Sequence, residues 1–209
     1  DRYLGDPSRD NLHVNGDTHQ FTLDHDLGQG WRTRVGASYR ETDLYGEAVD
    51  LTGTLQADGR TLTRRDSWRS LPARDTSVQA EVEGKLQTGG LRHTVLAGVE
   101  SWRLFMGQDI RYSTLASQPF AIDIYNPTYG QAPGNLTPGF DTRDRQRATG
   151  LFVQDQMDLS ERWKLLAGVR FDRYHQDYEN RLNRAVQTQS HSAATPRVGV
   201  TYLVNDRTS

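Results

Sequence analysis

The chain has 209 residues, a net charge of −2 and 34% hydrophobic residues. The near-neutral charge gives no reason to expect a nucleic-acid partner, and the lack of cysteine excludes a disulfide framework and a thiolate metal site. No apolar run approaches the roughly 20 residues that a membrane-spanning helix needs. The composition therefore fits either a soluble protein with a small core or a membrane barrel with a hydrated lumen.

Alternation of apolar and polar residues with a period of two marks the predicted strands. In chain order they are 17–27, 31–40, 76–86, 91–102, 148–159, 163–173 and 195–203. In the second of them Trp31, Val35 and Tyr39 share one face, and Arg32 and Arg34 share the other. Arginines facing a soluble core would be costly, whereas a barrel lumen keeps them hydrated.

The same alternation assigns a face to residues of the other strands. We expect these residues to face outward: Phe21, Leu23, Val78, Ala80, Val82, His93, Val95, Ala97, Val99, Thr149, Leu151, Val153, Met157, Leu165, Ala167, Val169, Phe171, Val198 and Val200. The charged residues Glu81, Glu83 and Arg170 then face the lumen together with the arginines of the second strand. We expect them to form ladders of mixed charge in contact with water.

Short and long connections alternate between the predicted strands. The short ones are 28–30, 87–90 and 160–162, and the long ones are 41–74, 103–145 and 174–193. Short turns at one end and long extracellular loops at the other are typical of outer-membrane barrels. We expect strand extensions within the first long connection, and we expect residues 103–145 to form an extracellular loop that reaches a ligand chamber. The pattern predicts an all-β fold of about seven antiparallel, up-and-down transmembrane β-barrel strands.

Several segments resemble the TonB-dependent siderophore receptors. Residues 150–155 resemble the family strand G-x-[YF]-x-Q-D, and residues 163–172 resemble W-x-L-x-x-G-x-R-x-D. Residues 195–199 resemble T-P-R-x-G, and residues 93–100 resemble H-x-[LV]-x-x-G-x-[DE]. Two further segments, 124–127 and 2–7, resemble loops of the ferrichrome and ferrioxamine branch.

The resemblance implies a part of a 22-stranded barrel whose family also carries an N-terminal plug domain and a TonB box. We therefore interpret residues 1–209 as a partial barrel domain, an internal fragment without the plug and the remaining strands. It implies an outer-membrane receptor and transporter for ferric siderophores, most readily of the hydroxamate type, and not an enzyme. Its expected partners are the ferric siderophore, the lipid bilayer and, through the plug, the TonB complex. Iron enters as a ferric siderophore, so no protein-bound cofactor or metal site is expected.

The candidate ligand-binding residues are aromatic and basic side chains near the predicted extracellular strand ends. A siderophore surrounds iron with its own oxygen atoms, so a receptor recognises the organic shell through rings and polar donors. By its distance from His93, Tyr112 matches a ligand-contacting aromatic of the ferrichrome-receptor branch, and it is our first candidate. The other candidates are Arg111, Trp68, Trp102 and Tyr125. His25 is not a metal candidate, because on a strand it points away from the flanking carboxylates.

Two alternatives stay open at this point. A passive porin would share the barrel but not the plug, and a soluble β-sandwich binding module would share the alternation but not the need for detergent. The sequence does not identify the siderophore.

Overall fold

The computed structural model describes residues 2–113 and 120–204, apart from the side chains of residues 53 and 54. Its strands are β1 His13–Gly28, β2 Trp31–Leu55, β3 Thr61–Thr88, β4 Leu91–Ser113, β5 Ile122–Asp123, β6 Leu136–Asp158, β7 Trp163–Asn180 and β8 Ala185–Tyr202. Together they form one antiparallel sheet in the order β1-β2-β3-β4-β6-β7-β8, with the two-residue β5 paired to β3. No helix in the described part of the chain is long and apolar enough to cross a membrane.

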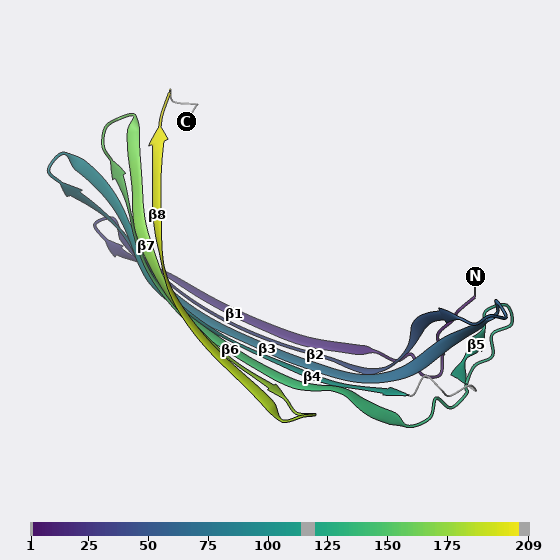
Figure 1. Ribbon diagram of the computed structural model, residues 1–209. Helices are drawn as coiled ribbons and strands as arrows, with labels where there is room; N and C mark the ends of the chain where they lie inside the picture. The colour runs from purple at the N-terminus through teal and green to yellow at the C-terminus, as the bar shows by residue number, and fades with distance from the viewer. Residues whose placement is uncertain (1, 114–119, 205–209) are drawn as a thin grey trace.

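The sheet is a single curved layer in which each long strand lies beside its neighbours in sequence. Figure 1 shows the three short turns gathered at one end, and the N-terminal segment and β5 at the other. The first turn uses left-handed backbone at Gly28, Gln29 and Gly30, with φ of 81°, 54° and 80°. Glycine adopts this conformation without steric cost, so two of the three positions are suited to the tight reversal. The predicted up-and-down topology and the shared end of the turns are confirmed.

The register of the strands confirms the predicted faces. One row of paired residues crosses the whole sheet and is apolar throughout: Leu23, Val35, Ala80, Val99, Leu151, Phe171 and Ala194. The next row belongs to the opposite face and is mostly polar: Asp24, Arg34, Glu81, Gly98, Phe152, Arg170 and Thr195. Phe21 pairs with Ala37, so it lies on the face opposite Arg34 as predicted. We call the apolar side the exterior face and the polar side the lumen face.

The exterior face is not covered by a second protein layer. Val198 is 74% exposed and Leu151 is 55% exposed, although both are apolar and sit in regular strands. Among the described residues the only buried hydrophobic side chains are Phe120 and Ile122, which lie beside the tip of β3 and not under the sheet. A β-sandwich would bury such a face against another sheet. Lipid is the environment that suits this face, and a soluble β-sandwich is not supported.

The strands are longer than the sequence pattern predicted. β2 and β3 continue far into the predicted connection 41–74, so that only residues 56–60 separate them. β4 extends to Ser113 and β6 begins at Leu136, so most of 103–145 is strand. Of the described residues between these two strands, 120–135, only the two residues of β5 are strand. Only residues 181–184 separate β7 from β8. Beyond the membrane both faces of a strand meet water, so the apolar alternation that marks a strand is lost although the backbone pairing continues.

Loop segments around Asp6 and Phe120 pack together at the extracellular tip of β3, and we call this group of packed loops the loop knot, although the chain is not knotted. Arg64 is only 1% exposed, and it donates from Nε to the carbonyl oxygen of Phe120 at 2.8 Å and from Nη1 to that of Gly5 at 2.7 Å. Asp6 is fully buried and accepts from the backbone amide of Gly130 at 2.9 Å and from the hydroxyl of Ser8 at 2.7 Å. Burial opposes the charged form of Asp6, but these hydrogen bonds outweigh it and hold its pKa below the ordinary value.

The loop knot lies on the exterior side of the sheet. Arg64 pairs with Leu51, and an unbroken register carries this face down to Trp31 and Gly84 at the other end of the hairpin. The segment around Phe120 therefore contacts the exterior face of β3. The prediction that all of 103–145 forms a loop over the ligand chamber is wrong in this respect, because two of its parts are strand and a third packs outside.

Candidate ligand-binding site

The lumen face carries a ladder of ion pairs near the turn end of the sheet. Arg34 Nε lies 2.6 Å from Asp24 and Arg34 Nη1 lies 3.7 Å from Glu81, while Arg32 Nη2 lies 2.9 Å from Glu83. These side chains are partly exposed, so each pair contributes little to stability. Their effect is to make this wall polar and hydrated, as the sequence predicted.

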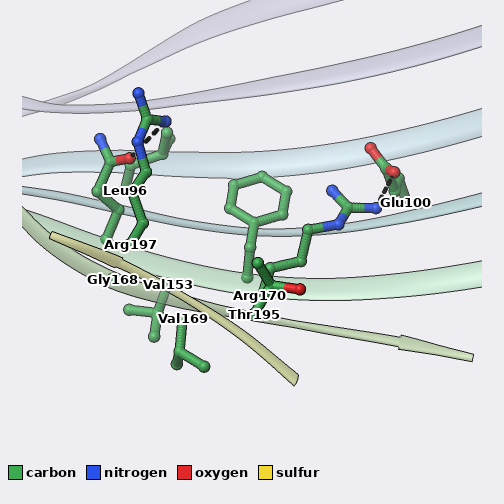
Figure 2. Close-up of a pocket in the computed structure, with 10 residues that line it drawn as sticks. Leu96, Glu100, Val153, Gly168, Val169, Arg170, Thr195 and Arg197 are labelled. Atoms are coloured by element: carbon green, nitrogen blue, oxygen red, sulfur yellow. Dashed lines mark hydrogen bonds and ion pairs between the residues drawn. The ribbon is translucent and has the colours of Figure 1, made fainter. Parts of the chain in front are cut away.

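A shallow hollow of about 370 Å³ opens on the same face between β4, β6, β7 and β8. Figure 2 shows Arg170 and Arg197 on its lumen side, whereas Val153 and Val169 point to the other side of the sheet. Arg170 pairs with Glu100 and with Asp172, so its charge is already compensated within the wall. Among the residues that line this hollow, Phe152 is the one aromatic side chain on which an organic chelate could pack.

An aromatic and basic cluster lies on the lumen face near the extracellular end. Tyr112 pairs with Ser67 on β3, which places it on the same face as Arg65. The guanidinium carbon of Arg65 lies 3.9 Å from the centre of the Tyr112 ring, and Phe140 meets the ring edge-on at 6.5 Å. A Cβ at Gly139 would lie 2.4 Å from the ring, so this glycine, beside a β-bulge, makes room for it. The ring is therefore held firmly in one orientation.

The basic part of the cluster has spare hydrogen-bonding capacity. Arg69 Nη2 lies 3.0 Å from Asp50 Oδ1, and Arg65 Nε lies 3.7 Å from Asp50 Oδ2. Two guanidinium groups thus share a single carboxylate. Within the described residues the Nε atoms of both arginines are buried without a hydrogen-bond partner. A buried donor without a hydrogen bond is costly. Because both side chains stay partly exposed, their remaining guanidinium donors can reach an oxygen-rich anionic ligand. We call Asp50, Arg65, Arg69, Tyr112 and Phe140 the lumen cluster.

The five residues predicted from the sequence do not form one site. Tyr112 and Trp102 both face the lumen, but Trp102 lies about 33 Å further along β4, at roughly 3.3 Å per residue. Trp102 packs there at a tilt against the Tyr174 ring, with 6.2 Å between the ring centres. The two therefore cannot contact one small ligand together.

Of the other three predicted residues, two lie on the exterior face and the third lies beyond β5, near the tip of β3. Trp68 and Arg111 are cross-strand partners on the exterior face, with the Arg111 guanidinium carbon 5.1 Å from the Trp68 ring centre. Tyr125 is 55% exposed beside β5, and Arg2 and Arg60 each lie 5.7 Å from its ring centre. The interpretation of Trp68 and Arg111 as lumen contacts is not supported, because strand alternation turns both residues outward. Trp68 lies where a strand extension was expected without an assigned face, and Arg111 lies in strand where a loop was expected.

Sequence reasoning missed Asp50, Arg65, Arg69 and Phe140. Three of them lie in 41–74, where strand extensions were expected but no face was assigned, and Phe140 lies in 103–145, which was predicted as loop. The signal that could have found them is the alternation of β2 and β3 continued past Tyr39 and Thr76 with the same register.

A curved, single-layer, up-and-down sheet with an apolar exterior and a charged lumen defines part of an outer-membrane β-barrel. The family described as "TonB dependent receptor-like, beta-barrel" matches residues 1–209. The chain belongs to this family, whose members are outer-membrane receptors rather than enzymes.

Similar proteins agree with this placement. The metal-pseudopaline receptor CntO of Pseudomonas aeruginosa strain UCBPP-PA14 is 38% identical over 96% of this chain and 29% of its own length. The ferrioxamine B receptor of Salmonella typhimurium strain LT2 is 25% identical over 89% of this chain and 26% of its own length. The structure of the ferric-catecholate import receptor Fiu from Escherichia coli K12, in its closed form, superposes with a TM-score of 0.77 at 18% identity, over 98% of this chain and 33% of that one. The chain thus spans less than a third of the curated relatives named here.

Proposed function

We propose that this chain is part of the wall of a receptor that binds a metal chelate at the lumen cluster and imports it with energy from the TonB complex. The observation that carries the proposal is the fixed Tyr112 ring beside two arginines that share one carboxylate. The ring offers a flat surface to the organic part of the chelate, and the guanidinium groups offer donors to its oxygen atoms. The metal is cargo, and that the receptor holds no metal or cofactor of its own remains a prediction.

The charge of the lumen cluster favours an anionic chelate. Two guanidinium groups against the single carboxylate of Asp50 leave a net positive charge beside Tyr112. A chelator with carboxylates keeps negative charge after binding a divalent metal, whereas three hydroxamates only neutralise Fe(III). The relative at 38% identity is named for a metal-pseudopaline complex, which supports a metallophore ligand in general. We therefore place a carboxylate-bearing metal chelate first.

The ferric hydroxamate predicted from the sequence is the second candidate. Relatives named as ferrioxamine receptors, at 24–25% identity, favour it. A plug domain and a TonB box, which the family resemblance implies, would be needed in the full-length protein for either ligand. A passive porin would instead pass small solutes without saturation and without TonB.

The test uses the full-length receptor in detergent, with binding measured by tryptophan fluorescence quenching. The probes are metal-loaded pseudopaline, ferrioxamine B and the metal salt alone. Replacing the two arginines of the cluster together, Arg65→Gln/Arg69→Gln, is expected to weaken binding of the anionic chelate at least tenfold and to affect ferrioxamine B less. Arg111→Gln is the matched control, because it removes an arginine at similar height from the exterior face.

Equal affinity of the double variant and the wild type for every chelate would contradict the proposed site. Loss of binding in Arg111→Gln alone would contradict the face assignment. Heat-modifiable mobility on gels checks that each variant is a folded barrel.

A further inference from the structure

An apolar patch lies on the lumen face, between the lumen cluster and the membrane-spanning part of the strands. Leu44 on β2 pairs with Leu71 on β3, and Val14 on β1 pairs with Leu44. Even-numbered residues of β4 face the lumen, so Met106 and Ile110 lie on the same side as these three. We call Val14, Leu44, Leu71, Met106 and Ile110 the lumen apolar patch.

At the height of this patch, leucines of β2 and β3 point inward. In the membrane the apolar partners Val35 and Ala80 face outward, toward lipid. Above the membrane Leu44 and Leu71 face the lumen, and their neighbours Asp43 and Ser70 face outward. The interior of such barrels is ordinarily polar, and an apolar side chain gains nothing by facing water. The inward leucines therefore indicate a contact partner inside the lumen.

The patch stays partly open to solvent. Met106 is 39% exposed and Val14 is 70% exposed, while Leu44, Leu71 and Ile110 are half-buried. The polar residue Gln108 lies between Met106 and Ile110 on the same face of β4, and its side-chain oxygen accepts a hydrogen bond from the Thr142 hydroxyl at 3.4 Å. Contiguous exposed apolar residues of this kind mark binding surfaces.

Polar groups of opposite charge limit the patch at its two ends. At the extracellular end Ile110 pairs with Arg69, whose guanidinium belongs to the lumen cluster. At the membrane end Met106 pairs with Asp144, whose carboxylate accepts from the Gln176 amide at 2.8 Å. The four residues from Ile110 to Met106 span about 13 Å at roughly 3.3 Å per residue. A ligand whose anionic end meets the arginines thus has an apolar surface of limited length directly beside it.

We propose that the lumen apolar patch binds an aliphatic chain of the chelate, so that the receptor selects an amphiphilic metal chelate with an anionic head and an apolar tail. This inference rests on the proposed function, because the head is the part that Arg65 and Arg69 bind. Phe140 pairs with Ile110 and connects the two surfaces. A chain of medium length, such as octyl, covers most of the distance from Ile110 to Met106. A fully hydrophilic chelate would leave the patch in contact with water.

The test compares two anionic chelates that differ only in their chain. The probes are the Ni(II) complexes of the EDTA monoamides of methylamine and of octylamine, which share the charged head. Binding to the full-length receptor in lipid nanodiscs is followed by tryptophan fluorescence quenching, and empty nanodiscs correct for partition of the probes into lipid. The wild type is expected to bind the octyl probe at least about twentyfold more tightly, since each buried methylene contributes about a factor of four.

The variants replace apolar side chains of the patch by a polar one of similar size. Leu71→Gln/Met106→Gln is expected to lose at least about tenfold of the preference for the octyl probe, because amide groups take the place of apolar surface. The single variants are expected to lose part of it. Leu166→Gln is the matched control, since it makes the same exchange on the lumen face near the turn end. Heat-modifiable mobility on gels checks that each variant is a folded barrel.

Each outcome bears on the proposal. A preference for the octyl probe that is lost in the patch variants and kept in Leu166→Gln supports it. Equal affinity of the wild type for both probes overturns it, and so does binding of metal-loaded pseudopaline but of neither probe. A preference that survives in Leu71→Gln/Met106→Gln also overturns it, because another part of the receptor would then cover the patch.

A further variant separates this proposal from the proposed function. Arg65→Gln/Arg69→Gln is expected to weaken both probes alike and to leave their affinity ratio unchanged. If this variant loses binding while the wild type does not distinguish the probes, the chelate site stands and the apolar chain is refuted. If it binds both probes as the wild type does, the proposed head site fails, whereas the affinity ratio of the patch variants still reports on the chain.

Discussion

Placing an arginine on the exterior face at mid-membrane is expected to destabilise the barrel. Ala80 is the best position, because it lies midway along the apolar run of β3 and its partners Val35 and Val99 offer no carboxylate. A charge at the bilayer midplane of such barrels costs about 2–4 kcal/mol, which is roughly a 30- to 700-fold change in the unfolding equilibrium. The assay is urea unfolding of the full-length receptor refolded in lipid vesicles.

The matched control is Gln79→Arg, on the lumen face of the same strand. Gln79 pairs with Gly36 and Glu100, so a new arginine there has space, water and a carboxylate nearby. Gly168 would be a poor control, because any Cβ would lie 2.8 Å from the carbonyl oxygen of Val153. If Gln79→Arg proved as damaging as Ala80→Arg, or more so, the assignment of faces across the sheet would be inverted.

Three further results are expected at the extracellular end. Tyr112→Ala should weaken chelate binding about tenfold to a hundredfold, since burying one ring is worth about 1–3 kcal/mol, and unchanged quenching curves would remove this ring from the site. Gly139→Val should also weaken binding because its Cβ would displace the Tyr112 ring, and wild-type affinity would show that the ring position does not matter. The pKa of Asp6 is lowered below its ordinary 3.8, so its contribution to the loop knot is present above that value and is lost as the pH falls through the lowered pKa. Limited proteolysis after brief acid exposure should therefore open residues 120–131 in the wild type at low pH and in Asp6→Asn at all pH values; equal resistance of both proteins at neutral pH would argue against this role.

The faces of the membrane-spanning strands could be predicted because their two sides meet different solvents. Ala97 illustrates this: within the continuous apolar run 95–99 its own chemistry does not decide a face, but the alternation of the whole strand does, and pairing with Val82 and Val153 confirms it. Lipid on one side and water on the other impose a period of two that survives even in ambiguous segments.

The extracellular half of the strands gave no such signal. Arg74, for example, faces outward and is exposed, and its lumen-facing neighbours meet water as well, so nothing in the pattern distinguishes strand from loop. This is why the lumen cluster was missed and why Trp68, which faces outward, was named as a ligand-binding candidate. The loop knot was unpredictable for another reason, because Arg64 is buried by contacts with Gly5 and Phe120, which are distant in sequence.

The most direct test of the proposed site is a structure of the full-length receptor with its metal chelate bound. We expect the chelate to contact the Tyr112 ring and its oxygen atoms to lie within hydrogen-bond distance of Arg65 or Arg69. Trp68 and Arg111 should lie outside the barrel without touching it. A chelate that rests on the exterior side of these strands, or that lies in the lumen without any contact to Tyr112 and the two arginines, would contradict the central claim.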